Sequence, residues 1–168
     1  RSEGWHFGNI GRFLERADKT GRIIDMKYYY LLPSPGYVGT PLDLMQWSAL
    51  LKSASAFEMY RKTFGKLDMS NIIKFLVLDR EFPRAMRYCL IQAEESLRSV
   101  VGRENFSFET KAEKELGRLR SELDYTDVND IFKSGLHEYL DNIQIKINDV
   151  GSAIAETFFA HTPNEKQS

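Results

Sequence analysis

The sequence predicts an all-α protein, an antiparallel bundle of about six helices. Long segments carry apolar residues at alternating spacings of three and four, which is the period of one face of a helix. Proline and glycine separate these segments by connections short enough for antiparallel neighbours. No group of segments predicts a sheet convincingly.

The first helix is expected from Trp5 to Tyr30, and the rest of the chain is expected to pack against it. A second apolar strip, formed by Ile23, Met26 and Tyr30, lies behind its main stripe. A helix that is apolar on two sides is packed on two sides. The main stripe consists of Phe7, Ile10, Leu14, Ala17, Gly21, Ile24 and Tyr28.

The second helix follows a Pro/Gly loop over residues 32–41. Thr40 is placed as its N-cap, Pro41 as its first residue, and Asp43 for a capping interaction. Its apolar positions continue without a glycine, so it is expected to run to about Tyr60 or Phe64 before Gly65 ends it.

Two further helices occupy the middle of the chain. Asp68 or Ser70 is expected to cap a short helix, although its apolar run from Ile72 to Leu78 also fits a strand on pattern alone. A fourth helix is expected from Pro83 to Gly102, and residues 103–105 are expected to form a loop.

The last third of the chain predicts two long helices with a short one between them. Thr110 and Glu113 have capping-box spacing at the start of a helix over about 109–123. Thr126 is expected to cap the short helix, and the final helix spans about 135–159 with a heptad-like seam. The seam consists of Leu136, Leu140, Ile143, Ile147, Val150, Ile154 and Phe158.

The composition favours one soluble domain in the cytoplasm. The 168 residues are 42% hydrophobic and 28% charged, so residues 1–168 are expected to form one domain with a frayed tail at 161–168. The net charge of -1 argues against nucleic acid and anionic membranes as partners, and no apolar run could cross a bilayer. Cys89 is the only cysteine, which excludes an internal disulfide and favours a reducing compartment.

A charged row of Glu15, Asp18, Arg22 and Asp25 runs beside the stripe of the first helix. One interpretation is a solvated face, because Glu15 with Lys19 and Asp18 with Arg22 have i,i+4 spacing, worth only about 0.2–0.5 kcal/mol a pair. The other interpretation is a functional site. Periodicity alone favours the solvated face.

Packing of the first helix on two sides would argue against a solvated face for Glu15 and its neighbour Arg16. Adjacent residues point about 100° apart, and Arg16 falls toward the second apolar strip. We therefore expect at least one of the two side chains to be mostly buried and bonded to another helix. The candidate partners are Arg80 or Arg84 for Glu15, and Asp79 or Glu138 for Arg16.

A second charged cluster lies at a tight junction between two helices, around Asp79, Arg80 and Arg84. Capping explains such residues at helix ends, and an anion-binding role for Arg84 at a helix start is the alternative.

If the charged residues form a functional site, the candidate catalytic residues are Glu15 and Arg16. The candidate binding residues are Asp18, Arg22, Asp25, Asp79, Arg80, Arg84 and His137.

The sequence predicts no metal and no cofactor. Glu3 and His6 have the Glu-x-x-His spacing of di-iron bundles, but His137 lacks the partner that a second copy needs. His137 is instead expected to flank the seam as a packed or pH-sensitive residue, and Cys89 to be an inert structural thiol. The chain has no Gly-rich phosphate loop, nucleophile elbow or Cys/His pair.

At Glu15-Arg16 and across most of its length the chain resembles the alpha-E proteins, bacterial all-helical proteins named for a Glu-Arg motif. The resemblance implies that the chain is the C-terminal half of a tandem duplication. That fits its start at Arg1 rather than methionine. The segments that carry the resemblance are GRFLERADKTGRIID, LPSPGYVG, QWSALLKSASAFEMYRK, FLVLDREFPRA, LGRLRSELDY and GLHEYLDNIQIKIN.

The resemblance also implies a pathway, because such proteins are commonly encoded beside ATP-grasp and transglutaminase-like proteins. It suggests an accessory module that binds an ATP-grasp ligase, a transglutaminase-like protein or a peptide substrate during peptide or amide-bond formation or modification. The rival hypothesis is an enzyme with Glu15 as general acid/base and Arg16 or Arg84 holding a carboxylate. A purely structural bundle is the third. The oligomeric state stays open.

Overall fold

The computed structural model describes residues 1–30, 36, 38–102 and 110–159, and these residues form α-helices without any strand. The predicted all-α class is confirmed, with more helices than expected. The loop expected over 32–41 lies partly outside the described residues, and the loop at 103–105 and the tail at 161–168 lie wholly outside them. The elements are α1 (Glu3–Tyr30), α2 (Pro41–Ser53), α3 (Phe57–Phe64), α4 (Met69–Leu78), α5 (Met86–Val101), α6 (Lys111–Asp124), α7 (Val128–Ser134), α8 (Leu136–Ile154) and the π-helix η2 (Ala155–Phe159).

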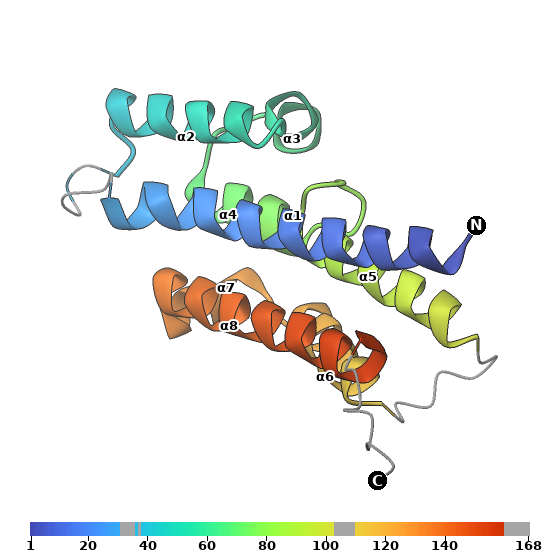
Figure 1. The fold of residues 1–168 in the computed structure, drawn as a ribbon. Coiled ribbons are helices and arrows are strands. Elements are labelled where there is room, and N and C mark those ends of the chain that lie inside the picture. The colour runs from blue at the N-terminus through green and yellow to red at the C-terminus, as the bar shows by residue number, and fades with distance from the viewer. Residues whose placement is uncertain (31–35, 37, 103–109, 160–168) are drawn as a thin grey trace, which may run out of the picture.

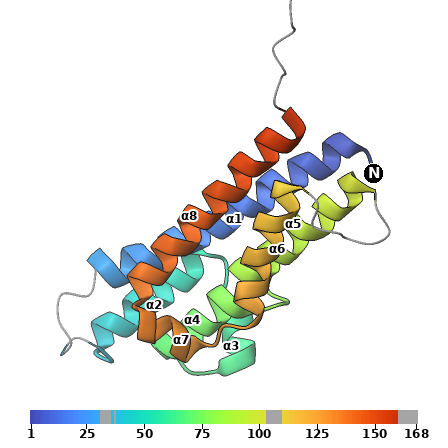
Figure 2. The same ribbon diagram turned by 90° about the horizontal axis from the view of Figure 1, so that it is seen from below.

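Four long helices, α1, α5, α6 and α8, form the main bundle (Figures 1 and 2). Each packs against the next in the ring α1–α5–α6–α8–α1, and consecutive members run antiparallel. The shorter helices α2, α3 and α4 lie between α1 and α5 in the chain, and α2 covers the side of α1 that faces away from α8. α1 is therefore packed on two sides, as the sequence predicted.

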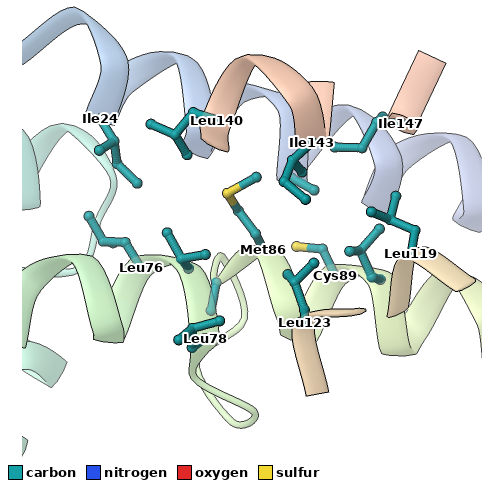
Figure 3. Close-up of a cluster of buried hydrophobic side chains, with 14 of the residues drawn as sticks. Ile24, Leu76, Leu78, Met86, Cys89, Leu119, Leu123, Leu140, Ile143 and Ile147 are labelled. Carbon is teal, nitrogen blue, oxygen red and sulfur yellow. The ribbon is translucent and has the colours of Figure 1, made fainter. Parts of the chain in front are cut away.

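The core is built from the predicted apolar stripes. On α1, Ile10, Leu14, Ala17 and Ile24 are buried, and the α8 seam from Leu136 to Ile154 is buried with them. Figure 3 shows the α5 side chains Met86 and Cys89 pointing into the space between the other bundle helices. Gly21 lets α1 approach α5 closely, since a Cβ there would lie 3.3 Å from the terminal carbon of Met86.

The expected second helix is two helices, because the chain turns sharply after α2. Ser55 has a φ of 52°, in the left-handed region that usually takes glycine. The amide of Ser55 donates to the Lys52 carbonyl at 3.0 Å, and that of Ala56 donates to the Leu51 carbonyl at 2.7 Å. These two bonds form a Schellman motif. The prediction of one helix to Tyr60 or Phe64 was wrong because no glycine marks this stop.

Other boundaries also differ from the expected ones. The run from Ile72 to Leu78 is helical in α4, as predicted. The next helix, α5, begins at Met86 and not at Pro83, since Ala85 has the extended backbone of an N-cap. Asp127, and not Thr126, caps α7 through a reciprocal bond with Asp130. The Thr110–Glu113 capping box of α6 is confirmed.

The second packed side of α1 contains a buried ion pair in place of the expected apolar strip. Lys27 Nζ lies 2.6 Å from Asp43 Oδ1 of α2, and the two side chains are 2% and 3% exposed. Lys27 also lies 4.8 Å from the ring centre of Trp47. Met26, expected on this strip, is 56% exposed, and the Tyr30 side chain lies outside the described part.

The Asp43 carboxylate is well satisfied in this position. Burial acts to raise the pKa of Asp43, but hydrogen bonds from Lys27 and from the Gly39 amide outweigh it and hold that pKa below its usual range. The pair therefore links α2 to α1 through a buried ionic contact.

Replacing Lys27 by methionine should lower the free energy of unfolding by about 3–5 kcal/mol, since it leaves the Asp43 carboxylate buried without its cation. The matched control is Lys19→Met, which breaks the exposed Glu15–Lys19 pair on the same helix and should cost under about 1 kcal/mol. Urea denaturation of both variants makes the comparison. Equal small losses would show that water reaches Asp43.

Candidate functional site

A groove opens beside Glu15 and Arg16, where α1 extends beyond the end of α2. We call it the Glu15–Arg16 groove, and its volume of about 300 Å³ is enough for a small ligand. It is lined by Arg12, Glu15, Arg16, Lys19, Thr20 and Ile23 of α1, by Ser53 and Ala54 at the end of α2, and by Arg84 before α5.

Glu15 lies on the exposed wall of this groove. Its side chain is 67% exposed and lies 3.3 Å from Lys19 Nζ, which is the solvated i,i+4 pair of the first interpretation. Neither Arg80 nor Arg84 is its partner. The expectation that Glu15 pairs with another helix was therefore wrong, because α2 ends before it could cover this position.

Arg16 is held more firmly than Glu15. It is half-buried, its Nη1 donates to the Pro83 carbonyl at 3.4 Å, and its guanidinium lies 5.2 Å from the ring centre of Phe13. The expected partners Asp79 and Glu138 were wrong, because the α4–α5 connection presents a backbone carbonyl at this point. Arg16 thus keeps most of its donors for another group.

The residues of the second cluster, Asp79, Arg80 and Arg84, have different positions and roles. The Asp79 carboxylate accepts from the amides of Glu81 and Phe82 at 2.8 Å each, which is the capping role. Arg80 lines a separate pocket against α5 and α6. Arg84 lines the Glu15–Arg16 groove, and its carbonyl accepts from the Thr20 hydroxyl at 2.8 Å. The fold therefore brings Arg84 to Glu15 and Arg16.

The other members of the charged row tie α1 to α8, on a different face of α1 from the groove. Asp18 accepts from Arg22 and from Gln144 of α8, both at 2.9 Å, and Asp25 lies 2.7 Å from Nδ1 of His137 of α8. The cavity between these residues holds about 20 Å³, room for little more than a water molecule. We interpret Asp18, Asp25 and His137 as inter-helix contacts, and Arg22 as a partner of Asp18 within α1.

Sequence reasoning missed Arg12, which lies one turn before Arg16 on the same side of α1. The i,i+4 spacing of the two arginines could have indicated it. It also missed buried Glu94 of α5, which accepts from Arg98 at 2.7 Å and from Arg120 of α6. Arg120 also bonds Asp124, and this network joins α5 to α6.

The only thiol lies outside the groove, in the core. Burial raises the pKa of the Cys89 thiol to about 12, although the nearby charges of Arg16 and Arg84 act to lower it. At neutral pH Cys89 is therefore a protonated core residue. Within residues 1–30, 36, 38–102 and 110–159, no three His, Cys, Asp or Glu side chains are placed to hold a metal ion.

The described chain is thus an all-helical domain that presents a Glu-Arg pair on the wall of an arginine-lined groove. It belongs to the Alpha-E family, described as a predicted alpha-helical domain with a conserved ER motif, and the match covers residues 1–159. Glu15-Arg16 is the one Glu-Arg dipeptide in the sequence, so the family motif lies on this groove. No curated protein and no solved structure matches the chain. None of the described helices is long and apolar enough to cross a membrane.

The His137–Asp25 contact should make stability depend on pH. The hydrogen bond to Asp25 raises the pKa of His137, with smaller contributions from Glu138 and Asp141, while partial desolvation opposes them. A raised folded-state pKa gives stability that is complete below the unfolded-state value of about 6.5 and is lost as the pH rises through the folded-state value.

Urea midpoints at about pH 6 and about pH 9 should therefore fall with pH more in the unchanged protein than in Asp25→Asn. Asp149→Asn, at an exposed position of α8, is the matched control and should keep the original pH dependence. The same pH dependence in Asp25→Asn as in the unchanged protein would contradict a role for this contact.

Proposed function

We propose that this protein is a non-catalytic helical binding module of a pathway that forms or modifies peptide or amide bonds. Its partner is an ATP-grasp ligase, a transglutaminase-like protein or their peptide substrate. This protein acts in the cytoplasm, where ATP is available to the ligase. The Glu15–Arg16 groove is the contact surface. The observation that carries this proposal is the placement of the family motif, with Arg84, on an open groove.

The chemistry of the groove supports binding more than catalysis. Arginine guanidinium groups recognise carboxylates and phosphates by paired hydrogen bonds. Arg16 lines the groove from α1, and Arg84 lines it from the connection before α5. None of the lining residues is a Cys or His, and the only Cys is a protonated core residue. A Cys–His nucleophile–base pair is therefore not formed by these lining residues.

The alternative is an enzyme acting on a peptide or amide, with Glu15 as general acid/base and Arg16 or Arg84 holding a carboxylate of the substrate. One observation favours it, since Glu15 lines the same groove as both arginines. A carboxylate beside a clamped substrate is the arrangement that general acid/base catalysis requires.

Arg16→Ala should weaken binding to the ATP-grasp protein from the same organism by at least about tenfold, as loss of an arginine hot spot does. Arg118→Ala, at an exposed arginine of α6 outside the groove, is the matched control and should bind normally. Binding is measured by co-purification and titration, and urea melts establish that each variant is folded. Equal binding by Arg16→Ala and the unchanged protein would show that the groove is not the contact surface for the ATP-grasp protein.

Glu15→Gln separates the binding module from the enzyme, because it removes the carboxylate and keeps the shape. The binding module predicts that pathway turnover with the ATP-grasp protein continues in this variant. Loss of turnover with fold and partner binding intact would favour the enzyme.

A further inference from the structure

We propose that the Glu15–Arg16 groove binds an extended acidic peptide, whose carboxylates are held by Arg12, Arg16 and Arg84. This inference rests on the proposed function, because it names the ligand class of the same groove. It goes beyond the pair of residues in the family motif by assigning two arginines outside it.

The first argument is that these three guanidinium groups have no carboxylate partner. In the described part of the chain, no ion pair within 4.0 Å involves Arg12, Arg16 or Arg84, and Glu15 is engaged by Lys19. By contrast, Arg87 and Arg98 of α5 and Arg120 of α6 are each paired with a carboxylate. Unpaired guanidinium groups thus gather in one groove of a chain whose net charge is -1. Such a cluster attracts an anionic ligand and raises its rate of binding.

The second argument is that the Arg16 side chain and the Arg84 backbone are positioned before any ligand arrives. Arg16 is held between the Pro83 carbonyl and the Phe13 ring, so little side-chain freedom remains to be lost on binding. The Thr20 hydroxyl holds the Arg84 carbonyl and fixes the backbone that carries Arg84 against α1. Arg12 stands one turn from Arg16 on the same helix.

The third argument is the length of the groove. From Arg12 to Ile23 its α1 wall extends for about 16 Å, at 1.5 Å a residue. An extended peptide of about five residues has that length, at about 3.3 Å a residue. A single phosphate ion would contact only part of it.

The lining also distinguishes an acidic peptide from a nucleic acid. None of the residues that line the groove is aromatic, so the groove lacks the aromatic rings on which single-stranded bases usually stack. At the end toward α2, Ser53 offers an exposed hydroxyl oxygen and Ile23 offers apolar contact. These are groups that suit the backbone and side chains of a peptide.

The probe for the test is a fluorescently labelled oligoglutamate peptide, and its binding is measured by fluorescence anisotropy at low salt. The unchanged protein should bind it saturably, and added salt should weaken that binding. Arg12→Gln and Arg84→Gln should each lower the affinity at least about tenfold, as loss of a charged hydrogen bond does. Arg118→Gln should change it less than about twofold. Thermal melts of each variant establish the fold.

Three results would overturn the inference. The first is no saturable binding of oligoglutamate by folded protein. The second is equal binding of a neutral oligoglutamine peptide, or an equal loss in Arg118→Gln. The third is competition by inorganic phosphate or a single-stranded oligonucleotide at lower concentration than by unlabelled oligoglutamate.

Arg16-dependent capture of the ATP-grasp protein without peptide binding would overturn only this inference. Peptide binding without that capture would support this inference and count against the proposed partner.

Discussion

The packing of α1 on two sides is the constraint on which the rest of the structure depends. One side meets α5 and α8 and carries the buried apolar stripe. The other side of α1 meets α2 over only part of its length. The charged residues on this side are buried where α2 covers them and accessible where it does not. Where α2 covers it, Lys27 is buried against Asp43, and where α2 has ended, Arg12 and Arg16 face an open groove. Coverage thus decides whether a cation serves the fold or is available to a ligand.

Much of the fold follows from short-range patterns in the sequence. The α1 stripe, the α8 seam and the Thr110–Glu113 capping box are local features, and each predicted its element correctly. The break at Ser55 could not be predicted in this way. Serine has no preference for a left-handed backbone, and the burial of the next residue, Ala56, is a tertiary feature that no local pattern indicates.

Less of the site could be predicted, because a groove depends on where helices meet. The sequence indicated Glu15, Arg16 and Arg84 separately, and it could not show that a connection 64 residues away in sequence reaches Thr20 and brings Arg84 with it. It also assigned Asp18, Arg22 and Asp25 to the same row as Glu15. Gln144 and His137, the partners of Asp18 and Asp25, come from α8, so the role of these two carboxylates depends on tertiary contacts that no helical period reveals.

The left-handed serine at the end of α2 sets the size of the groove as well as the path of the chain. A residue other than glycine held in that region costs about 1 kcal/mol or more, so this stopping point is maintained against a local preference for continuing the helix. One further turn of α2 would advance its end by about 5.4 Å over α1. A longer α2 would therefore leave a shorter open wall beside the same Glu-Arg pair.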